Sequence, residues 1–500
     1  MEITAAAGDI TRSAVDAIAV GCYEGAAAPE GAAAAVDAAL GGAIVQLVSR
    51  GEIKGKLDQV TLVHTLGKLP AGKVAVVGLG KKTDLTLDRV RGAAAVVCRA
   101  LRRASAADVA FAPLGAGVSG ITVSASAQAI AEGAVLGLYT FRKHVTKEPE
   151  NGEIKALTVV DGDPERLPEL TAGAARGRIM AEASNLARDM VNEPANYMTP
   201  TDMAEAARGL ARTYGLEVNV LDREQARALG MGAFLGVAQG SQQPPQFIVL
   251  RYNGRGAFGN DIALVGKGIT FDCGGISLKP SEGMGEMKGD MSGGAAVMGA
   301  LAALAQLKPK INVLVIIAAT ENLPSGTALK PGDVVTALGG KTIEIISTDA
   351  EGRLTLADAI GYARQQGAKQ VVDIATLTGA CVVALGEICT GAFGNNQPLM
   401  DRVLAAAREA GELIWQMPMF EEYKEQNKSD VADIKNTGGR PAGAITAAQF
   451  IAEFAGDTPW AHLDIAGTNM TDKERTYLVK GATGVPVRTL VNLVMGLASA

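Results

Sequence analysis

The sequence predicts a two-domain α/β protein whose larger, C-terminal domain is built on a mainly parallel central sheet covered by helices. Three observations lead to this fold class. The chain has 500 residues, which is more than one hydrophobic core usually serves. Aromatic residues make up only 4% of it, whereas glycine is abundant, so helices can approach sheets closely. Short apolar runs alternate with helical stretches, which is typical of parallel sheets covered on both faces.

Residues 1–165 are expected to form an α/β domain that holds almost no concentrated chemistry. Leu87–Ala104 has the periodicity of a helix rich in alanine and arginine. Gly78–Gly80 follows a strand candidate, but the third glycine and the downstream acidic residue of a dinucleotide site are missing, so a turn is the better interpretation. The strand candidates are Ala17–Val20, Val60–His64, Val74–Val77 and Ala156–Val160.

Proline and glycine signals around residues 149–164 predict a domain boundary near residue 165. Residues 166–192 are expected to form a connecting helix, which the proline at position 194 ends. A second helix begins at Pro200, with Thr199 as its N-cap. The second domain is therefore expected to span residues 193–500.

Strand candidates and helices alternate through this second domain, which predicts the mainly parallel sheet. The helices between the strands include Gly294–Leu307 and Leu356–Gln365. The strand candidates are Phe247–Arg251, Ile262–Val265, Val313–Ala318, Ile343–Ile346, Val371–Ile374 and His462–Ile465.

Composition excludes several classes of function. The formal net charge of −6 argues against nucleic acid as the main partner, because phosphate binding needs a basic face. The five cysteines are widely spread and no pair has CxxC spacing, which indicates reduced thiols. The N-terminus lacks the pattern of a signal peptide, and no uncharged window has membrane-spanning length. A soluble, cytoplasmic protein is expected.

The segment Val265–Asp290 has the highest density of reactive side chains. It begins Val-Gly-Lys-Gly-Ile-Thr-Phe-Asp-Cys-Gly-Gly-Ile-Ser-Leu-Lys-Pro and ends Met-Lys-Gly-Asp. It follows the apolar run Ile262–Val265 and, from Gly266 onward, shows neither helix nor strand periodicity. Since open α/β sheets bind ligands outside the carboxyl ends of their strands, this glycine-rich loop is predicted to form the active site.

A second charged segment, Ser347–Leu354, follows the strand candidate Ile343–Ile346. Asp349, Glu351 and Arg353 are spaced by two, so an extended chain would direct all three side chains to one side. This segment is predicted to meet the first one at the carboxyl edge of the sheet.

Asp272 and Asp290 of the first segment, together with Asp349 and Glu351 of the second, place four carboxylates on the two loops. An isolated aspartate among these would be interpreted as a solvated loop charge. Clustered carboxylates repel one another unless cations neutralise them, and divalent metal ions do this most simply.

The residue types restrict the metal. His64, His144 and His462 are scattered and lack HExxH or similar spacing, which argues against a histidine or thiolate zinc site. Oxygen ligands suit Mg²⁺, Mn²⁺ or Zn²⁺, and the carboxylates suffice to bridge two ions. Two such ions activate a shared water, so the chemistry predicted is hydrolysis.

These segments resemble the signatures of the leucyl aminopeptidase family, which is peptidase M17 or cytosol aminopeptidase. The resemblance rests first on Val265–Pro280, Met287–Met291 and Thr348–Leu354. It covers residues 170–495 strongly and the N-terminal domain more loosely. Further family motifs match in the family's order at Asn192–Asn196 with Thr199–Pro200, at Ala375–Gly379 and at Gly481–Gly484.

The resemblance implies an N-terminal macro-domain-like α/β domain and a C-terminal di-metal peptidase catalytic domain. It implies hydrolysis of the N-terminal residue, preferably leucine or another apolar one, from peptides with a free N-terminus. The reaction would use a two-metal-activated water and bicarbonate-assisted proton transfer. The implied cofactors are two divalent ions per subunit (Mn²⁺ or Zn²⁺, or else Mg²⁺) and bicarbonate, and the implied assembly is a homohexamer.

The resemblance also assigns a role to each metal ligand. Asp272 and Glu351 would bridge the two ions, and Asp349 would complete the more exchangeable one. Lys267 and Asp290 would complete the tighter one. A lysine ligand must be neutral, which requires burial and adjacent dications to lower its pKa.

Three further residues receive catalytic or bicarbonate-binding roles from the resemblance. Lys279 would polarise the scissile carbonyl and stabilise the oxyanion. Arg353 cannot be a base, because a guanidinium stays protonated, and would instead hold the bicarbonate. Leu377, with its neighbour Thr376, would offer backbone contacts to substrate and bicarbonate.

The sequence departs from the family pattern at two positions. Ser347 stands where an asparagine is common, which affects any substrate contact made by that amide. Cys273 stands where serine is more frequent, and a buried, inert residue is the favoured interpretation.

The sequence argues against two alternative functions. Gly340–Thr342 is similar to the end of a P-loop, but Val335 occupies a position that requires glycine. A regulatory DNA-binding protein is disfavoured by the acidic balance, and a gel-shift titration against salt would discriminate.

Overall fold

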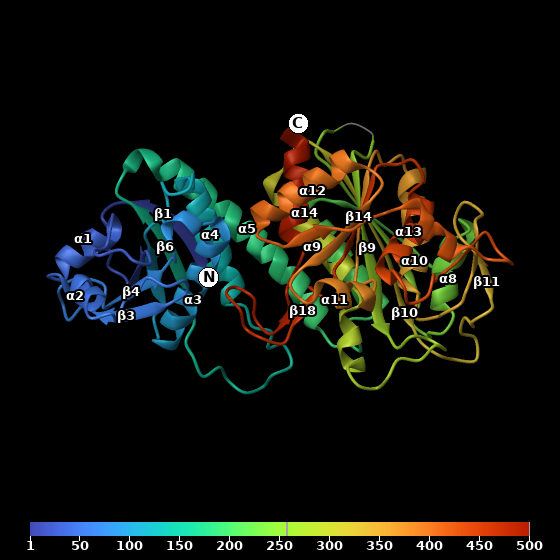
Figure 1. Ribbon diagram of the computed structural model, residues 1–500, viewed down its shortest axis with the longest axis horizontal. Coiled ribbons are helices and arrows are strands. Elements are labelled where there is room, and N and C mark those ends of the chain that lie inside the picture. The colour runs from blue at the N-terminus through green and yellow to red at the C-terminus, as the bar shows by residue number, and fades with distance from the viewer. Residues whose placement is uncertain (257–258, 500) are drawn as a thin grey trace. The chain divides into compact units, whose positions relative to one another are not determined.

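The computed structural model describes residues 1–256 and 259–499. Its contacts divide the chain into two compact units, shown from blue to red along the chain in Figure 1. Unit 1 comprises Met1–Glu182 and Lys473–Lys480, and unit 2 comprises Ala183–Asp472 and Gly481–Ala500. This division differs from the boundary expected at residue 165. It falls inside the long helix α5 (Leu167–Asn192), and a short C-terminal segment groups with unit 1.

Unit 1 is built on a six-stranded sheet in the order β1-β6-β5-β2-β4-β3. All neighbouring strands are parallel except β3, which runs antiparallel to β4. Each strand predicted for this part of the chain overlaps an observed one. The strands are β1 (Glu2–Ala7), β2 (Ala17–Cys22), β3 (Val60–His64), β4 (Lys73–Gly78), β5 (Asp108–Phe111) and β6 (Ala156–Asp161).

Helices cover both faces of this sheet. Successive residues of a strand point to opposite faces, and here both sets are apolar, so both faces need to be covered. Ala17 belongs to one hydrophobic cluster, and its neighbour Ile18 belongs to the other. Helices α1 (Ala32–Ala39) and α2 (Ala43–Ser49) pack with the Ile18 cluster, and α3 (Leu87–Arg103), α4 (Val123–Gly137) and the first part of α5 pack with the Ala17 cluster. Among the described residues no single helix is long and apolar enough to cross a membrane. In the part of the chain that the structure describes, the bent pair α1 and α2 passes that test jointly, by length and composition alone.

Unit 2 is built on an eight-stranded sheet in the order β15-β14-β17-β13-β9-β10-β8-β7. Its four central strands, β17, β13, β9 and β10, are mutually parallel. The adjoining strands β14 and β8 run antiparallel to them, and at the two edges β15 is parallel to β14 and β7 is antiparallel to β8. The strands are β7 (Glu217–Leu221), β8 (Gln246–Asn253), β9 (Ile262–Asp272), β10 (Asn312–Asn322), β13 (Val371–Ala375), β14 (Thr390–Gly394), β15 (Ile414–Gln416) and β17 (Trp460–Asp464).

Two helical layers cover the eight-stranded sheet, and Figure 1 shows them on either side of β9 and β14. One layer contains α6 (Pro200–Tyr214), α9 (Ser292–Leu307), α12 (Gln397–Ala410) and α14 (Val487–Ser499). The other contains α8 (Gly232–Ala238), α10 (Gly352–Gln365), α11 (Gly379–Leu385) and α13 (Gly443–Ala455). The α/β fold with a mainly parallel central sheet is thus confirmed.

One strand prediction is wrong in its placement. Ile343–Ile346 was expected in the main sheet, but the observed strand is β12 (Thr342–Glu344), which lies in a separate three-stranded sheet with β11 (Val334–Thr336) and β16 (Ile434–Lys435). Gly339 and Gly340 have φ of +98° and +93° in the β11–β12 connection, so the P-loop-like sequence forms a tight turn.

A buried carboxylate joins α10 to the elements around it. Asp358 is fully buried and accepts hydrogen bonds from the backbone N–H groups of Phe234 (2.7 Å) and Leu338 (2.7 Å). Burial raises the pKa of Asp358 to about 7, against the lowering effect of these donors. Since α10 follows the second charged segment, this contact also restrains the site described below.

We predict that Asp358→Asn destabilises unit 2 by about 1–3 kcal/mol, because one backbone N–H would face an amide NH₂ in place of an oxygen. Calorimetry at pH 8 should show a lower Tm. The control is Asp401→Asn, an exposed aspartate that accepts from Gln397, and it should leave the Tm unchanged. Equal Tm values for the two variants would contradict this account of Asp358.

Candidate active site

The first charged segment does not begin as a loop, contrary to the sequence prediction. Strand β9 continues through both glycines to Asp272, so Lys267 lies within the strand opposite Ala318 of β10. The glycines concealed the strand period, since they carry no side chain. Lys267 is 3% exposed and emerges from the sheet interior.

Glycines allow helix α9 to begin almost in contact with β9. A Cβ on Gly266 would lie 2.5 Å from the Cα of Gly294, and a Cβ on Gly293 would lie 2.0 Å from the carbonyl oxygen of Ile374. This close approach brings Asp290, which immediately precedes the helix, beside the strand that carries Lys267.

The second charged segment is not extended throughout, so this part of the sequence prediction is wrong. Glu351 has helical backbone angles (φ −78°, ψ −37°) and stands at the N-cap of α10, and Arg353 lies in its first turn. A helix start still directs the Glu351 carboxylate to the carboxyl edge of the sheet. Gly352 leaves the space that Lys267 needs, because a Cβ there would lie 2.6 Å from the lysine Cε.

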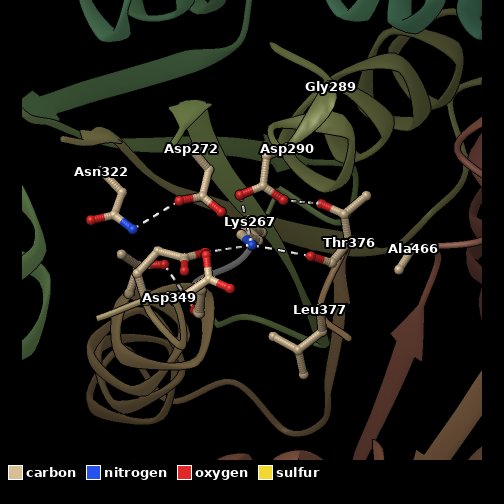
Figure 2. Close-up of polar contacts among 12 residues, drawn as sticks. Lys267, Asp272, Gly289, Asp290, Asn322, Asp349, Thr376, Leu377 and Ala466 are labelled. Carbon is tan, nitrogen blue, oxygen red and sulfur yellow. Dashed lines mark hydrogen bonds and ion pairs between the residues drawn. The ribbon is translucent and has the colours of Figure 1, made fainter. Parts of the chain in front are cut away.

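Lys267 lies at the centre of the site, as Figure 2 shows. Its Nζ is 2.7 Å from a carboxylate oxygen of Asp290 and 2.7 Å from one of Glu351. It also donates to the carbonyl oxygen of Thr376 at 3.0 Å, while the Thr376 hydroxyl donates to Asp290 at 2.7 Å. Thr376, which directly follows β13, is therefore bonded to both Lys267 and Asp290.

Lys279 makes the matching contacts on the outer side. Its Nζ is 2.8 Å from Asp272 and 2.5 Å from Asp349. The side chain is 23% exposed, against 3% for Lys267, so Lys279 is the lysine that solvent or a substrate can reach. The four predicted carboxylates and the two predicted lysines thus form one cluster, in which each lysine contacts two carboxylates.

Burial and an excess of negative charge shift the pKa values of the lysine and carboxylate side chains in the site. Burial lowers the pKa of Lys267, but nearby carboxylates, Asp290 first among them, raise it above its usual value overall. Burial raises the pKa of Asp290, Glu351 and Asp349, with only partial compensation from the lysines. The four carboxylates therefore need more positive charge than two lysines provide.

The donor set fits divalent metal ions. Asp272, Asp290 and Glu351 are all buried, and each offers an oxygen within 4.8 Å of the others. The Glu351 Oε2 atom is buried and has no hydrogen-bond partner among the described residues. Buried, unsatisfied carboxylate oxygens are costly unless a cation binds them, and oxygen donors are those that Mg²⁺, Mn²⁺ and Zn²⁺ accept.

Comparison with known proteins agrees with this site. The profile described as "Cytosol aminopeptidase family, catalytic domain" matches residues 185–491, and that of the family's N-terminal domain matches residues 19–148. The chain belongs to the cytosol aminopeptidase family, peptidase M17. It is therefore a metal-dependent aminopeptidase.

The similarity extends over nearly the whole aminopeptidase chain. It is 47% identical over 486 residues, 97% of both chains, to a probable cytosol aminopeptidase of Alkaliphilus metalliredigens. It is 51% identical over 452 residues to one of Solibacter usitatus, covering 90% of this chain and 92% of the relative.

Two solved structures have the same fold. A mutant of tomato leucine aminopeptidase matches with a TM-score of 0.89 at 37% identity, covering 99% of this chain and 96% of that one. The bottromycin maturation enzyme BotP in complex with Mn matches with a TM-score of 0.85 at 36% identity, covering 97% of this chain and 100% of that one.

Arg353 and Leu377, the two residues expected to contact bicarbonate, lie next to residues of the carboxylate cluster. Arg353 is buried and donates to the carbonyl oxygen of Asn436 at 2.8 Å. Burial lowers its pKa to about 10, so it remains a cation near neutrality. The Leu377 backbone N–H donates to Asp464 at 3.1 Å.

Sequence reasoning missed two residues that hold the aminopeptidase site in place. Asn322 donates to the Asp272 carboxylate at 2.8 Å and to the Thr348 carbonyl oxygen at 3.0 Å, and so joins the two charged segments. Asp464 accepts from the backbone of Leu377 and from the hydroxyl of Thr378. Both end central parallel strands, so the rule that located Asp272 also applies to them.

The two departures from the family pattern have local explanations. The Ser347 hydroxyl accepts from the backbone N–H of Asp349 at 3.3 Å, so serine still shapes the turn before that carboxylate. Cys273 is 4% exposed and its thiol donates to the Asn322 carbonyl oxygen at 3.2 Å. Burial raises the pKa of this thiol, as expected for an inert residue.

We predict that Asn322→Ala weakens divalent metal binding by about 10- to 100-fold, because carboxylate ligands depend on the groups that orient them. Isothermal titration of the metal-free protein with Mn²⁺ measures the change. Asn219→Ala, at an exposed position of β7, is the control and should bind as the unmodified protein does. An Asn322→Ala affinity equal to that of the control would contradict the orienting role.

Proposed function

We propose that this aminopeptidase hydrolyses the N-terminal residue, preferably leucine or another apolar one, from peptides, with two divalent ions and bicarbonate as cofactors. The observation that carries the proposal is the cluster of four carboxylates, three of them buried, and two lysines at the carboxyl edge of parallel strands. The apolar preference is supported by the similarity to a leucine aminopeptidase.

The carboxylates divide naturally between two ions. Asp272 and Glu351 would be shared by both ions, Asp349 would hold the outer one, and Asp290 with Lys267 would hold the inner one. The side chain of Asp349 is 37% exposed whereas that of Asp290 is 7% exposed, which supports the more exchangeable outer ion. When bound, two divalent ions supply Lewis acidity and lower the pKa of water for hydrolysis. Mn²⁺ and Zn²⁺ are the proposed metals, with Mg²⁺ as an alternative, and Mn occurs in the BotP complex.

The remaining residues would handle the substrate and the proton. Lys279 is the accessible cation of the site, and its ammonium group would donate to the scissile carbonyl oxygen as negative charge develops there. Arg353 would hold bicarbonate by charge-assisted hydrogen bonds, and its Nε has no hydrogen-bond partner among the described residues. The bicarbonate would accept the proton. The backbone of Thr376 and Leu377 would contact substrate and bicarbonate.

The chain is further proposed to act in the cytoplasm as a homohexamer, with neither membrane nor nucleic acid as a partner. The names of its relatives support the location. Light scattering at micromolar concentration should give six times the chain mass of 51.2 kDa. A fully active monomer would contradict the hexamer while leaving the chemistry untouched.

The requirement for a free N-terminal amine on the substrate is tested with a peptide whose amine is acetylated. If the free α-amine is required, the enzyme should cleave leucyl-glycine but not N-acetyl-leucyl-glycine, because the acetyl group removes the amine's capacity to bind a metal ion. Product glycine is measured for both peptides under identical conditions. Comparable turnover of the blocked peptide would exclude an aminopeptidase mechanism and indicate an endopeptidase or amidase.

The separate roles proposed for the metal ligands, Lys279 and Arg353 are tested by measuring bound metal and kcat in four variants. Asp272→Ala and Glu351→Ala should lose both metal and activity, since each removes a ligand proposed to serve both ions. Lys279→Ala should keep its metal and lose about 10²–10³ in kcat, the usual cost of an oxyanion donor. Arg353→Ala should keep its metal with a milder loss, because water or a buffer anion partly replaces bicarbonate.

Lys330→Ala provides the control, since Lys330 is an exposed lysine paired only with nearby Asp333 among the contacts described. It should match the unmodified enzyme in both readouts. A metal-free Lys279→Ala protein, or an Asp272→Ala protein with both ions bound, would overturn the proposed roles even if peptide hydrolysis itself were demonstrated.

A further inference from the structure

Asn436 is fully buried in unit 2, and its side chain bonds the backbone of the second charged segment and of the residue before it. Its Oδ1 atom accepts from the N–H groups of Ile346 at 2.8 Å and Ser347 at 3.3 Å. Its amide nitrogen donates to the carbonyl oxygens of Ser347 at 2.6 Å and Ala350 at 3.4 Å. One side chain therefore bonds backbone groups on both sides of Asp349.

The backbone of Asn436 is itself fixed at two points. Its N–H group donates to the carbonyl oxygen of Glu344 at 2.9 Å, and its carbonyl oxygen accepts from Nη1 of Arg353 at 2.8 Å. Glu344 ends β12, and Arg353 is buried in the first turn of α10. Because both anchors belong to regular elements, the side chain of Asn436 has a defined direction toward the turn that contains Asp349.

The small three-stranded sheet brings Asn436 to this place. Strand β16 runs parallel to β12, with Ile434 opposite Ile343, and Asn436 directly follows β16. Just before β16, the Asp433 carboxylate accepts from the backbone N–H of Thr342 at 2.8 Å and from its hydroxyl at 2.9 Å. The pairing of β16 with β12 therefore fixes Asn436 relative to the chain that enters the second charged segment.

The hydrogen bonds of Asn436 reach only part of the carboxylate cluster. Asp349 lies inside the turn that they hold. Lys267 and Asp290 belong to other elements and are both bonded to Thr376. Among the described residues, neither of these two hydrogen-bonds to Asn436. Loss of the Asn436 amide should therefore displace Asp349 and leave Lys267 and Asp290 in place.

We propose that Asn436 is a positioning residue of this aminopeptidase, which holds Asp349 in place for the outer, more exchangeable divalent ion. The inference rests on the proposed two-ion function, and it identifies a residue outside the ligand set on which the outer ion depends. An amide suits the position, because it offers the turn both a donor and an acceptor and adds no charge to an acidic cluster. Removing a group that orients a metal ligand typically weakens metal binding by about 10- to 100-fold.

Isothermal titration of the metal-free, full-length protein with Mn²⁺ tests this role. The unmodified protein should bind two ions, one in a tighter and one in a weaker step. In Asn436→Ala the weaker step should lose about 10- to 100-fold in affinity. The tighter step should stay unchanged, because Lys267 and Asp290 are held by Thr376. Equal weakening of both steps, or no weakening of either, would overturn the positioning role.

Asn312→Ala is the matched control, since Asn312 is another buried amide that bonds backbone groups. It is 3% exposed, accepts from the N–H of Arg255 at 3.0 Å and donates to the carbonyl oxygen of Gly259 at 3.0 Å. It lies at the start of β10, away from the carboxyl edge that carries the cluster. This variant should lower the Tm and leave both Mn²⁺ steps unchanged. Selective loss of the weaker step in the control as well would indicate general destabilisation and overturn the proposal.

A second variant tests the same connection without removing a buried group. Asp433 is exposed, and Asp433→Ala removes its two hydrogen bonds to Thr342, which loosens β16 from β12. The weaker Mn²⁺ step should lose about threefold or more in affinity, with the tighter step unchanged. Asp222→Ala is its control, because Asp222 is an exposed aspartate of unit 2 that accepts from the N–H of Gln225. If Asn436→Ala fails to fold, an unchanged weaker step in Asp433→Ala overturns the proposal.

The titration also separates this inference from the proposed function. A single binding step in the unmodified protein would refute the two-ion function, and the role of Asn436 with it. Two steps in the unmodified protein that persist unchanged in Asn436→Ala would refute the positioning role alone. A selective loss of the weaker step in Asn436→Ala, absent from Asn312→Ala, is the result that the proposal predicts.

Discussion

The structure of unit 2 depends on one electrostatic constraint, which is that four carboxylates are held together at a largely buried edge of a parallel sheet. Carboxylates removed from water are costly, and each one raises the pKa of its neighbours. Two lysines offset part of this charge. Lys267 is held between Asp290 and Glu351, and Lys279 between Asp272 and Asp349. The remaining negative charge makes the site a receptor for divalent cations, as suits a member of a metal-dependent family.

Much of the surrounding sequence serves to make this cluster geometrically feasible. Gly266 and Gly293 allow α9 to approach β9, and Gly352 leaves room for the Lys267 side chain, because an added Cβ at any of these positions would overlap neighbouring atoms. Asn322 ties the two charged segments together, and Asp358 anchors α10 behind them. The buried charge thus requires particular residue types at the strand ends and small residues next to them.

The sequence predicted the alternation of strands and helices and the residues that meet at the site, because strand ends and charged glycine-rich segments are local patterns. It placed the start of the first loop wrongly, since Gly266 and Gly268 conceal the strand that continues to Asp272. It missed Asn322 because a lone amide after an apolar run carries no charge signal. It also expected Arg353 in extended chain, since spacing alone does not reveal that α10 begins at Gly352. The length of β9 and the start of α10 depend on how glycines pack in three dimensions, and the periodicity of the sequence does not show this packing.

The central claim is that this cluster holds two divalent ions at once. Anomalous diffraction at the manganese edge, from crystals grown with Mn²⁺, tests it most directly. Two peaks are predicted per chain, with one bordered by Asp290 and Lys267, the other by Asp349, and both in contact with Asp272 and Glu351. A single peak at saturating Mn²⁺, or peaks that avoid Asp272 and Glu351, would contradict the account.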